Sequence, residues 1–181
     1  MEDSSQNIEN PRPEQTAFAE SVLSIIGPTA EKFGFKKILV EIKTYWSVIV
    51  FRKGKLYVKI ASTSYPTDYP NYYDVILGEG KSHSSGNYWN SVTTLRLAKI
   101  IDPAKNAVTY NFPYDDRVKM SIEAANKDLI KYGLSFLSGD LSVFSRVRKK
   151  VNEELASYNI AEIDFKPVKF DESGIYQIHE S

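Results

Sequence analysis

The chain contains no cysteine, and this absence removes several classes of chemistry at once. Disulfide bonds, thiol nucleophiles, iron–sulfur clusters and cysteine-type zinc sites are all excluded. Histidine is nearly as scarce, since only His83 and His179 occur and no His-x-x-x-His spacing exists. We therefore expect no metal site and no cofactor, and no complete set of catalytic residues is visible.

Long apolar runs and an excess of charge of either sign are also missing. No stretch approaches the roughly 18 apolar residues of a membrane span, and the polar, acidic start Met1–Glu14 lacks the apolar core of a signal peptide. The 23 basic residues are balanced by 23 acidic ones, which argues against a protein devoted to nucleic acid or to anionic membranes. We expect a cytoplasmic protein without a membrane partner.

The composition is otherwise that of an ordinary globular protein. The 181 residues are 42% hydrophobic and 25% charged, and a chain of this length buries about 70% of the surface that its unfolded state exposes. Pro11 and Pro13 in a polar context predict a flexible N-terminal arm over residues 1–15. Residues 16–181 are expected to form a single α+β domain, in which residues 160–181 are a partly extended C-terminal segment.

Hydrophobic periodicity predicts mainly strands in the first half of that domain and mainly helices in the second. Alternation over residues 37–77, with a short piece at 108–112, predicts an antiparallel hairpin or meander in which Lys53-Gly54 is a tight turn. A period of 3.6 predicts helices over residues 16–33, 88–101, 117–137 and 140–156, with Gly27-Pro28 expected to break or kink the first. Segregated elements of this kind are typical of an α+β fold with helices packed on a sheet.

A glycine-rich stretch after a predicted strand is the nearest approach to a nucleotide-binding motif. Gly80-Lys81-Ser82 fits the end of a P-loop, but the position that needs the first glycine is Val75. His83 follows among serines, where a general base could activate a hydroxyl, yet neighbours in sequence rarely converge as the members of a triad do. We interpret the stretch as a connection between a strand and the next helix, with His83 as a loop residue that a partner can reach.

The segment from Tyr65 to Tyr73 has the least ordinary composition in the chain, because it is rich in tyrosine and proline. Tyrosine offers a large contact area at a low cost in side-chain entropy. Such a loop suits recognition of a protein or a carbohydrate, but it equally suits a segment that folds back over a sheet edge. The candidate binding residues are these tyrosines and the polar or aromatic groups near them: Tyr65, Asp68, Tyr69, Tyr72, Tyr73, Glu79, His83 and Trp89.

One region carries a resemblance to known proteins. A glycine-rich loop that follows a strand is succeeded by Trp89-Asn90-Ser91-Val92 and then by Leu95-Arg96-Leu97 on a predicted helix. Over Tyr73–Leu97, and at the break Phe136–Asp140, the chain resembles small bacterial proteins of the toxin-immunity type. The resemblance implies a cytoplasmic α+β protein that acts by binding a partner protein, and it transfers no functional residue.

Three functions are open at this point. The first is a non-enzymatic protein-binding module, of which an immunity protein that occludes a toxin is the narrowest form. The second is a carboxylate-dependent hydrolase with Asp68, Asp74, Glu79 and His83 near one pocket. The third is nucleic-acid binding through the basic residues Arg146, Arg148, Lys149 and Lys150 of the last helix, whose field the following Glu153 and Glu154 reduce. The sequence favours the first function, with another protein as the partner.

Overall fold

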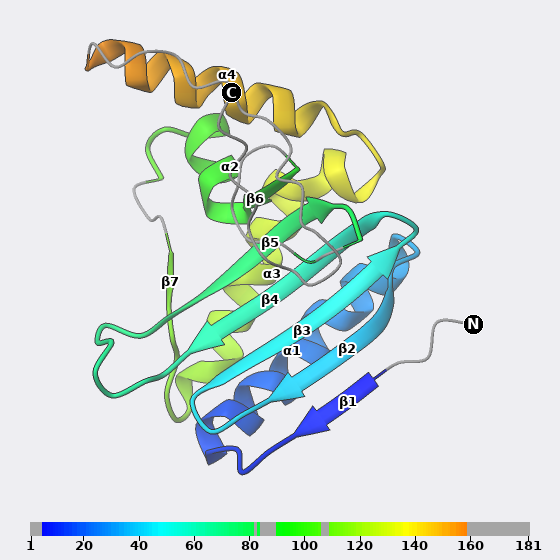
Figure 1. Ribbon diagram of the computed structural model, residues 1–181, viewed down its shortest axis with the longest axis vertical. Helices are drawn as coiled ribbons and strands as arrows, with labels where there is room; N and C mark the ends of the chain where they lie inside the picture. The colour runs from blue at the N-terminus through cyan, green and yellow to red at the C-terminus, as the bar shows by residue number, and fades with distance from the viewer. Residues whose placement is uncertain (1–4, 82, 84–89, 106–108, 159–181) are drawn as a thin grey trace, which may run out of the picture.

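Seven strands form one mixed, mostly antiparallel sheet in the computed structural model, which describes residues 5–81, 83, 90–105 and 109–158 (Figure 1). Six of them are adjacent in the order β1-β2-β3-β4-β5-β6, and β7 pairs with β5 beside β6. Four helices accompany the sheet in this part of the chain. The predicted α+β class is confirmed.

The predicted hairpin forms the centre of the sheet. β3 (Trp46–Lys53) and β4 (Leu56–Thr63) pair antiparallel, with Lys53 opposite Leu56. Gly54 in the turn has a φ of 59°, a left-handed conformation that glycine adopts readily because it lacks a Cβ atom. β2 (Lys36–Ile42) and β5 (Tyr72–Glu79) extend the antiparallel sheet on either side.

The N-terminal residues are not a flexible arm where the structure describes them. β1 (Ser5–Ile8) pairs in parallel with β2, so that Ile8 lies opposite Ile42. Parallel neighbours need a crossover connection, and α1 (Pro13–Lys32) supplies it. The prediction of a free arm over residues 1–15 is therefore wrong from Ser5 onward, because a short, exposed and mostly polar edge strand carries no apolar alternation.

The first helix also continues through the break expected at Gly27-Pro28. Gly27 is buried over β3, where an added Cβ atom would lie 3.8 Å from the Phe51 ring. Proline inside a helix costs about 3 kcal/mol, and the burial of side chains such as Val22 and Ile26 on the same helix offsets that cost. The helix ends instead at Lys32, with Phe33 as its C-cap residue, and Gly34 follows with a φ of 82°.

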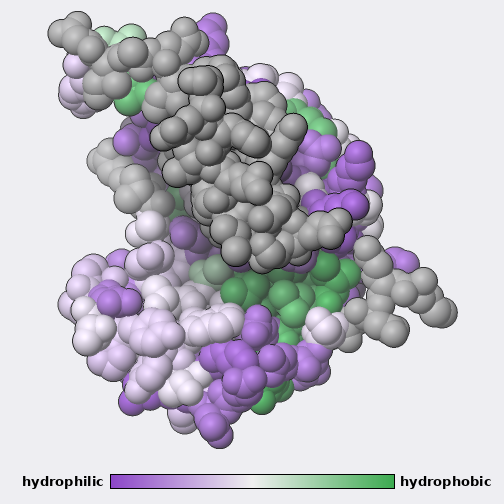
Figure 2. All heavy atoms as spheres, in the orientation of Figure 1, coloured by the Kyte–Doolittle hydropathy of each residue, from purple (hydrophilic) through white to green (hydrophobic). Residues whose placement is uncertain are grey.

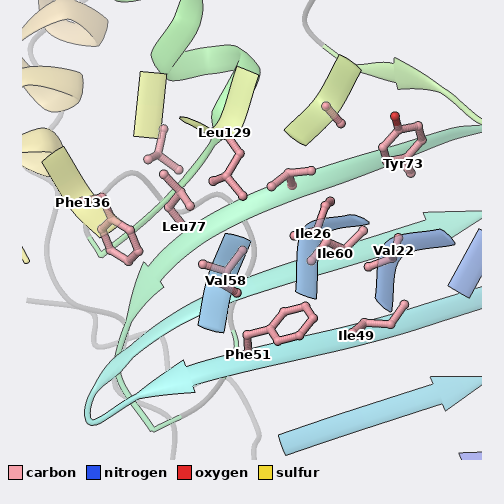
Figure 3. Close-up of a cluster of buried hydrophobic side chains, with 14 of the residues drawn as sticks. Val22, Ile26, Ile49, Phe51, Val58, Ile60, Tyr73, Leu77, Leu129 and Phe136 are labelled. Atoms are coloured by element: carbon pink, nitrogen blue, oxygen red, sulfur yellow. The ribbon is translucent and has the colours of Figure 1, made fainter. Parts of the chain in front are cut away.

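Two long helices cover one face of the sheet and enclose the main core. α3 (Arg117–Leu137) begins and ends where the sequence predicts, and it packs against α1 behind the strands in Figure 1. Apolar side chains from both helices meet those of the central strands (Figure 3), among them Val22, Ile26, Ile49, Phe51, Val58, Ile60, Tyr73, Leu77, Leu129 and Phe136. This face holds the larger of the two clusters of buried apolar side chains.

The region after β5 differs from its prediction. The expected helix over residues 88–101 is replaced, where it is described, by β6 (Ser91–Thr93) and the shorter α2 (Thr94–Ile101). The Thr93 hydroxyl accepts a hydrogen bond from the Arg96 backbone N–H at 3.1 Å and so caps α2. The remaining elements are β7 (Tyr110–Asn111) and α4 (Ser142–Ser157), and α4 packs against α2 and β6. The predicted C-terminal segment 160–181 lies outside the described residues.

The opposite face of the sheet carries a smaller apolar cluster. Val50, Tyr57 and Ile76 are buried there, and partly buried side chains pack beside them: Ile38, Leu39 and Val48. Figure 2 views this face and shows hydrophobic side chains gathered over β2 and β3. In the described part of the chain, no helix is long and apolar enough to cross a membrane.

Candidate functional site

Aromatic side chains concentrate at one end of the sheet, where Tyr45, Trp46, Tyr65, Tyr69 and Tyr72 lie. We call this the aromatic end. The β2–β3 turn, the loop between β4 and β5 and the start of α1 meet there (Figure 1). Backbone hydrogen bonds join these pieces: the Glu9 N–H donates to the Ile42 carbonyl at 2.9 Å, and the Ser64 N–H donates to the Tyr45 carbonyl at 2.7 Å. Segments far apart in the sequence thus form one continuous surface.

Three tyrosines of the predicted loop lie exposed at this end. Tyr65 is 40% exposed, Tyr69 is 82% exposed and Tyr72 is 44% exposed. Asp68 lies in the same loop and is exposed as well, with the Thr67 hydroxyl donating to its carboxylate at 3.2 Å. An exposed tyrosine ring keeps a large apolar surface in contact with water, which is unfavourable. Groups of exposed aromatic side chains are therefore typical of interaction surfaces.

Tyr73 does not belong to this surface, which corrects one predicted anchor. It is fully buried, its ring stacks on that of Tyr110 at 4.9 Å, and its hydroxyl lies 2.8 Å from the Ser121 hydroxyl. Burial raises its pKa to about 12. Strand residues alternate between faces, so Tyr72 points away from the helices and Tyr73 points into the core (Figure 3).

The loop between β4 and β5, residues 64–71, is called the tyrosine loop below. A buried polar network fixes its first end. The Gln15 side chain, at the start of α1, is fully buried and accepts hydrogen bonds from the hydroxyls of Ser47 at 2.8 Å and Ser62 at 2.9 Å. Its amide donates to the Ser64 hydroxyl at 2.8 Å. The network joins α1, β3, β4 and the first loop residue, so each buried polar group there has a partner.

The second end of the loop is fixed at Asn71, which is buried. The Asn71 carbonyl accepts a hydrogen bond from the Phe112 N–H at 2.9 Å, and its side-chain amide donates to the Tyr114 hydroxyl at 2.5 Å. The loop is therefore held at both ends by the rest of the fold. Its exposed tyrosines are presented from a supported base.

A cavity of about 330 Å³ opens beside the loop. Three of its lining residues are aromatic, namely Tyr45, Trp46 and Tyr65, and the others are Glu9, Asn10, Lys43 and Thr44. The Tyr45 and Tyr65 rings lie 5.1 Å apart, and the Arg12 guanidinium lies 5.1 Å from the centre of the Tyr45 ring. Tyr45 thus contacts a cation as well as a neighbouring ring.

The charges at the cavity are unevenly exposed. Lys43 Nζ lies 2.5 Å from a Glu9 carboxylate oxygen and 3.6 Å from one of Glu41, which leaves one excess negative charge. The Lys43 side chain is 19% exposed, whereas that of Glu9 is 62% exposed. The hydrogen bond to Lys43 and its positive charge lower the pKa of Glu9, so this carboxylate is ionised at neutral pH. Of the two charged side chains that line the cavity, Glu9 is therefore the more accessible to solvent.

The register of β5 separates the residues that the hydrolase hypothesis would bring together. Tyr72 and Glu79 are the two ends of the strand, and seven steps of about 3.4 Å place them about 24 Å apart. Asp68 precedes the first end, and Glu79 and His83 lie at the other. Neither Asp68, Asp74, Glu79 nor His83 lines the cavity at the aromatic end. Glu79 and His83 are therefore remote from the tyrosines, and Trp89 lies outside the described residues.

His83 packs against Tyr57, on the face of the sheet that carries the smaller apolar cluster, close to basic side chains. Its Nε2 atom lies 2.6 Å from an Arg52 guanidinium nitrogen, and its carbonyl accepts a hydrogen bond from Lys59 at 2.9 Å. Burial, together with the positive charges of Arg52 and Lys59, lowers the pKa of His83. The Arg52 guanidinium also donates hydrogen bonds to the backbone carbonyls of Gly80 and Lys81, each at 2.9 Å. Gly80 and Lys81 of the stretch that resembles a P-loop are thus held against the sheet through their carbonyl groups.

Two further features bear on the remaining predictions. On α4, Arg146 and Lys149 are exposed, while Arg148 is half-buried and Lys150 lies 3.3 Å from Glu153. In the described ranges, no group of three or more histidine, aspartate or glutamate residues could hold a metal ion. The basic face is therefore partly neutralised by its own helix.

Sequence reasoning missed Gln15, Trp46 and the pair Glu9–Lys43 as parts of the aromatic end. No local signal marks them, because they meet only after β1 pairs with β2 and α1 crosses the sheet. Tyr73 could have been placed correctly from its alternation with Val75 and Leu77. Comparisons of the chain with protein-family models, with curated proteins and with solved structures gave no match.

Proposed function

We propose that this protein is a non-catalytic binding protein that recognises another protein through the aromatic end of its sheet. The observation that carries the proposal is a set of three exposed tyrosines at the aromatic end: Tyr65 and Tyr69 on the loop between β4 and β5, and Tyr72 at the start of β5. Aromatic side chains dominate the energetics of protein interfaces, and tyrosine combines a large apolar ring with a hydroxyl that can pair with polar groups.

The support of the loop adds to this argument. Association loses free energy whenever it must order flexible segments, so a loop that is already held binds more tightly than a free one. The hydrogen bonds of Gln15 and Ser64 at one end and of Asn71 at the other supply that order before a partner arrives. Tyr69, the most exposed of the three rings, is the anchor that we expect to contribute most.

A toxin neutralised by occlusion is the narrowest form of this proposal, and it is the form to which the resemblance over Tyr73–Leu97 points. In that form the tyrosine loop would bury its rings against the toxin, and Asp68 would meet a basic group of the toxin. The wider proposal requires only a protein partner.

The experiment compares three tagged proteins as baits in the cells that produce this protein: the wild type, Tyr69→Ala and Tyr158→Ala. Tyr158 is the matched control, because it is 76% exposed but lies at the end of α4, away from the loop. We expect a protein retained by the wild type and by Tyr158→Ala and lost by Tyr69→Ala, with equal melting temperatures for all three. Capture that is identical with all three baits, or none with any, contradicts the proposal.

A further inference from the structure

We propose that the cavity lined by Tyr45, Trp46 and Tyr65 receives an arginine side chain of the partner protein, whose guanidinium stacks on the rings and pairs with the Glu9 carboxylate. The inference rests on the protein-binding function proposed above, because it names the group that the partner inserts beside the tyrosine loop. Tyr65 belongs to both the loop and the cavity lining, so the two surfaces are continuous.

The size and lining of the cavity suit one inserted side chain. Its volume of about 330 Å³ lies at the small end of the range for ligand sites, roughly 300–1,000 Å³. Three aromatic residues form its apolar part, and Glu9, Asn10, Lys43 and Thr44 form its polar part. Aromatic faces carry negative charge density and attract cations, most strongly where water is excluded.

The exposed charge at the cavity selects a cation over an anion. Lys43 is neutralised by Glu9 at 2.5 Å and Glu41 at 3.6 Å, and only 19% of its side chain is exposed. The Glu9 carboxylate is the more accessible group at 62%. A cation entering the cavity gains an ionised carboxylate, whereas an anion would have to displace Glu9 from Lys43.

The chain itself provides an example of the contact that we propose. Arg12 lies over the Tyr45 ring at 5.1 Å while it pairs with Glu14 at 3.4 Å, so one guanidinium at this end already combines a ring with a carboxylate. The guanidinium is planar, so it can lie flat on a ring and still present two N–H groups to a carboxylate. An ammonium group has no flat face, so we expect arginine to bind better than lysine.

The probe for this inference is N-acetylarginine amide, with the neutral N-acetylcitrulline amide as its matched control. The chain has two tryptophans, and a Trp46→Phe variant identifies the Trp46 indole signal in an NMR spectrum. We expect the arginine probe to shift that signal to saturation, with an affinity about tenfold higher than that of the citrulline probe. Equal shifts with both probes, or no shift with the arginine probe, overturn the inference.

Two pairs of variants separate the cavity from its surroundings. Glu9→Gln is expected to weaken binding of the arginine probe about tenfold. Glu41 lies outside the lining, so Glu41→Gln is expected to weaken that binding less than about threefold. Tyr65→Leu keeps the carboxylates of Glu9 and Glu41 and is also expected to weaken binding, so it tests the cavity even where Glu9→Gln loosens β1. Tyr69→Ala is expected to leave probe binding unchanged, because Tyr69 does not line the cavity.

The outcomes distinguish this inference from the proposed function. If Tyr69→Ala loses a captured protein but the arginine probe leaves the Trp46 signal unmoved, the protein-binding function stands and the arginine pocket is refuted. If the probe binds as expected but capture does not depend on Tyr69, the cavity binds a guanidinium and the proposed function fails. A response of the Trp46 signal to glucose rather than to the arginine probe would identify a carbohydrate site and refute the inference.

Discussion

Replacing Gln15 by alanine tests whether the buried polar network holds the aromatic end together. Gln15 is fully buried and makes three hydrogen bonds, to Ser47 at 2.8 Å, Ser62 at 2.9 Å and Ser64 at 2.8 Å. Each buried hydrogen bond contributes about 1 kcal/mol net, so the loss of three predicts a fall of about 3 kcal/mol in the free energy of unfolding.

The three serines keep part of their hydrogen bonding in the variant, which sets an upper bound on the loss. The hydroxyls of Ser47 and Ser62 remain 2.8 Å apart, and the Ser64 hydroxyl can still donate to the Tyr45 carbonyl at 3.3 Å. None of the three is left without a partner, so we add no further penalty for unpaired groups. For a domain of this size, about 3 kcal/mol corresponds to a fall in Tm of roughly 6–12 °C.

Urea unfolding and thermal melting measure the effect, with Gln6→Ala as the matched control. Gln6 is exposed on β1, and its replacement is expected to change the free energy of unfolding by less than about 0.5 kcal/mol. Gln15→Leu restores most of the lost volume and is expected to remain destabilising, because the hydrogen bonds are still absent. A loss below about 1 kcal/mol for Gln15→Ala would refute the reasoning that this network carries the base of the loop.

Two further predictions concern residues of the sheet. Gly78→Ala would place a Cβ atom 2.1 Å from the Tyr57 ring on the facing strand, so we expect the free energy of unfolding in urea to fall by about 1–3 kcal/mol. The control is Gly27→Ala, whose Cβ atom would lie an ordinary 3.8 Å from Phe51, and it is expected to be neutral or stabilising by up to about 1 kcal/mol. Equal effects of the two substitutions would show that the contact with Tyr57 is relieved at no cost. Burial raises the pKa of Asp74 above 3.8, so the folded state holds this proton more tightly than the unfolded state, and stability falls as pH rises from the unfolded-state pKa through the folded-state pKa. Asp74→Asn is therefore expected to raise the free energy of unfolding at pH 7 and to leave it unchanged below the unfolded-state pKa. The same difference at both pH values would show that the carboxyl does not titrate in this way.

The sequence predicts those parts of the fold that depend on local pattern. The hairpin around Gly54 follows from alternation on both sides of a turn, and α3 follows from an apolar stripe of period 3.6 over 21 residues. β1 and β6 were missed because each has only three or four residues and is stabilised by a strand distant in sequence. Pro28 remains inside α1 because tertiary packing outweighs the local cost of a proline.

The candidate site was predictable in part for the same reason. Tyr65, Tyr69 and Tyr72 stand out by composition alone, and their exposure is a consequence of where β4 ends and β5 begins. Tyr73 shares their composition, but the period of two along β5 turns it into the core. The Glu9–Lys43 pair depends on the pairing of β1 with β2, which no local pattern encodes.

The most direct test of the central claim is the dissociation constant of the captured partner, measured with purified proteins. We predict that Tyr69→Ala raises Kd at least tenfold, about 1.4 kcal/mol, as expected for an anchoring tyrosine at an interface. Tyr158→Ala, with a similar exposed fraction on α4, is predicted to leave Kd unchanged. The same Kd for Tyr69→Ala and the wild type, at equal stability, would contradict recognition through the aromatic end.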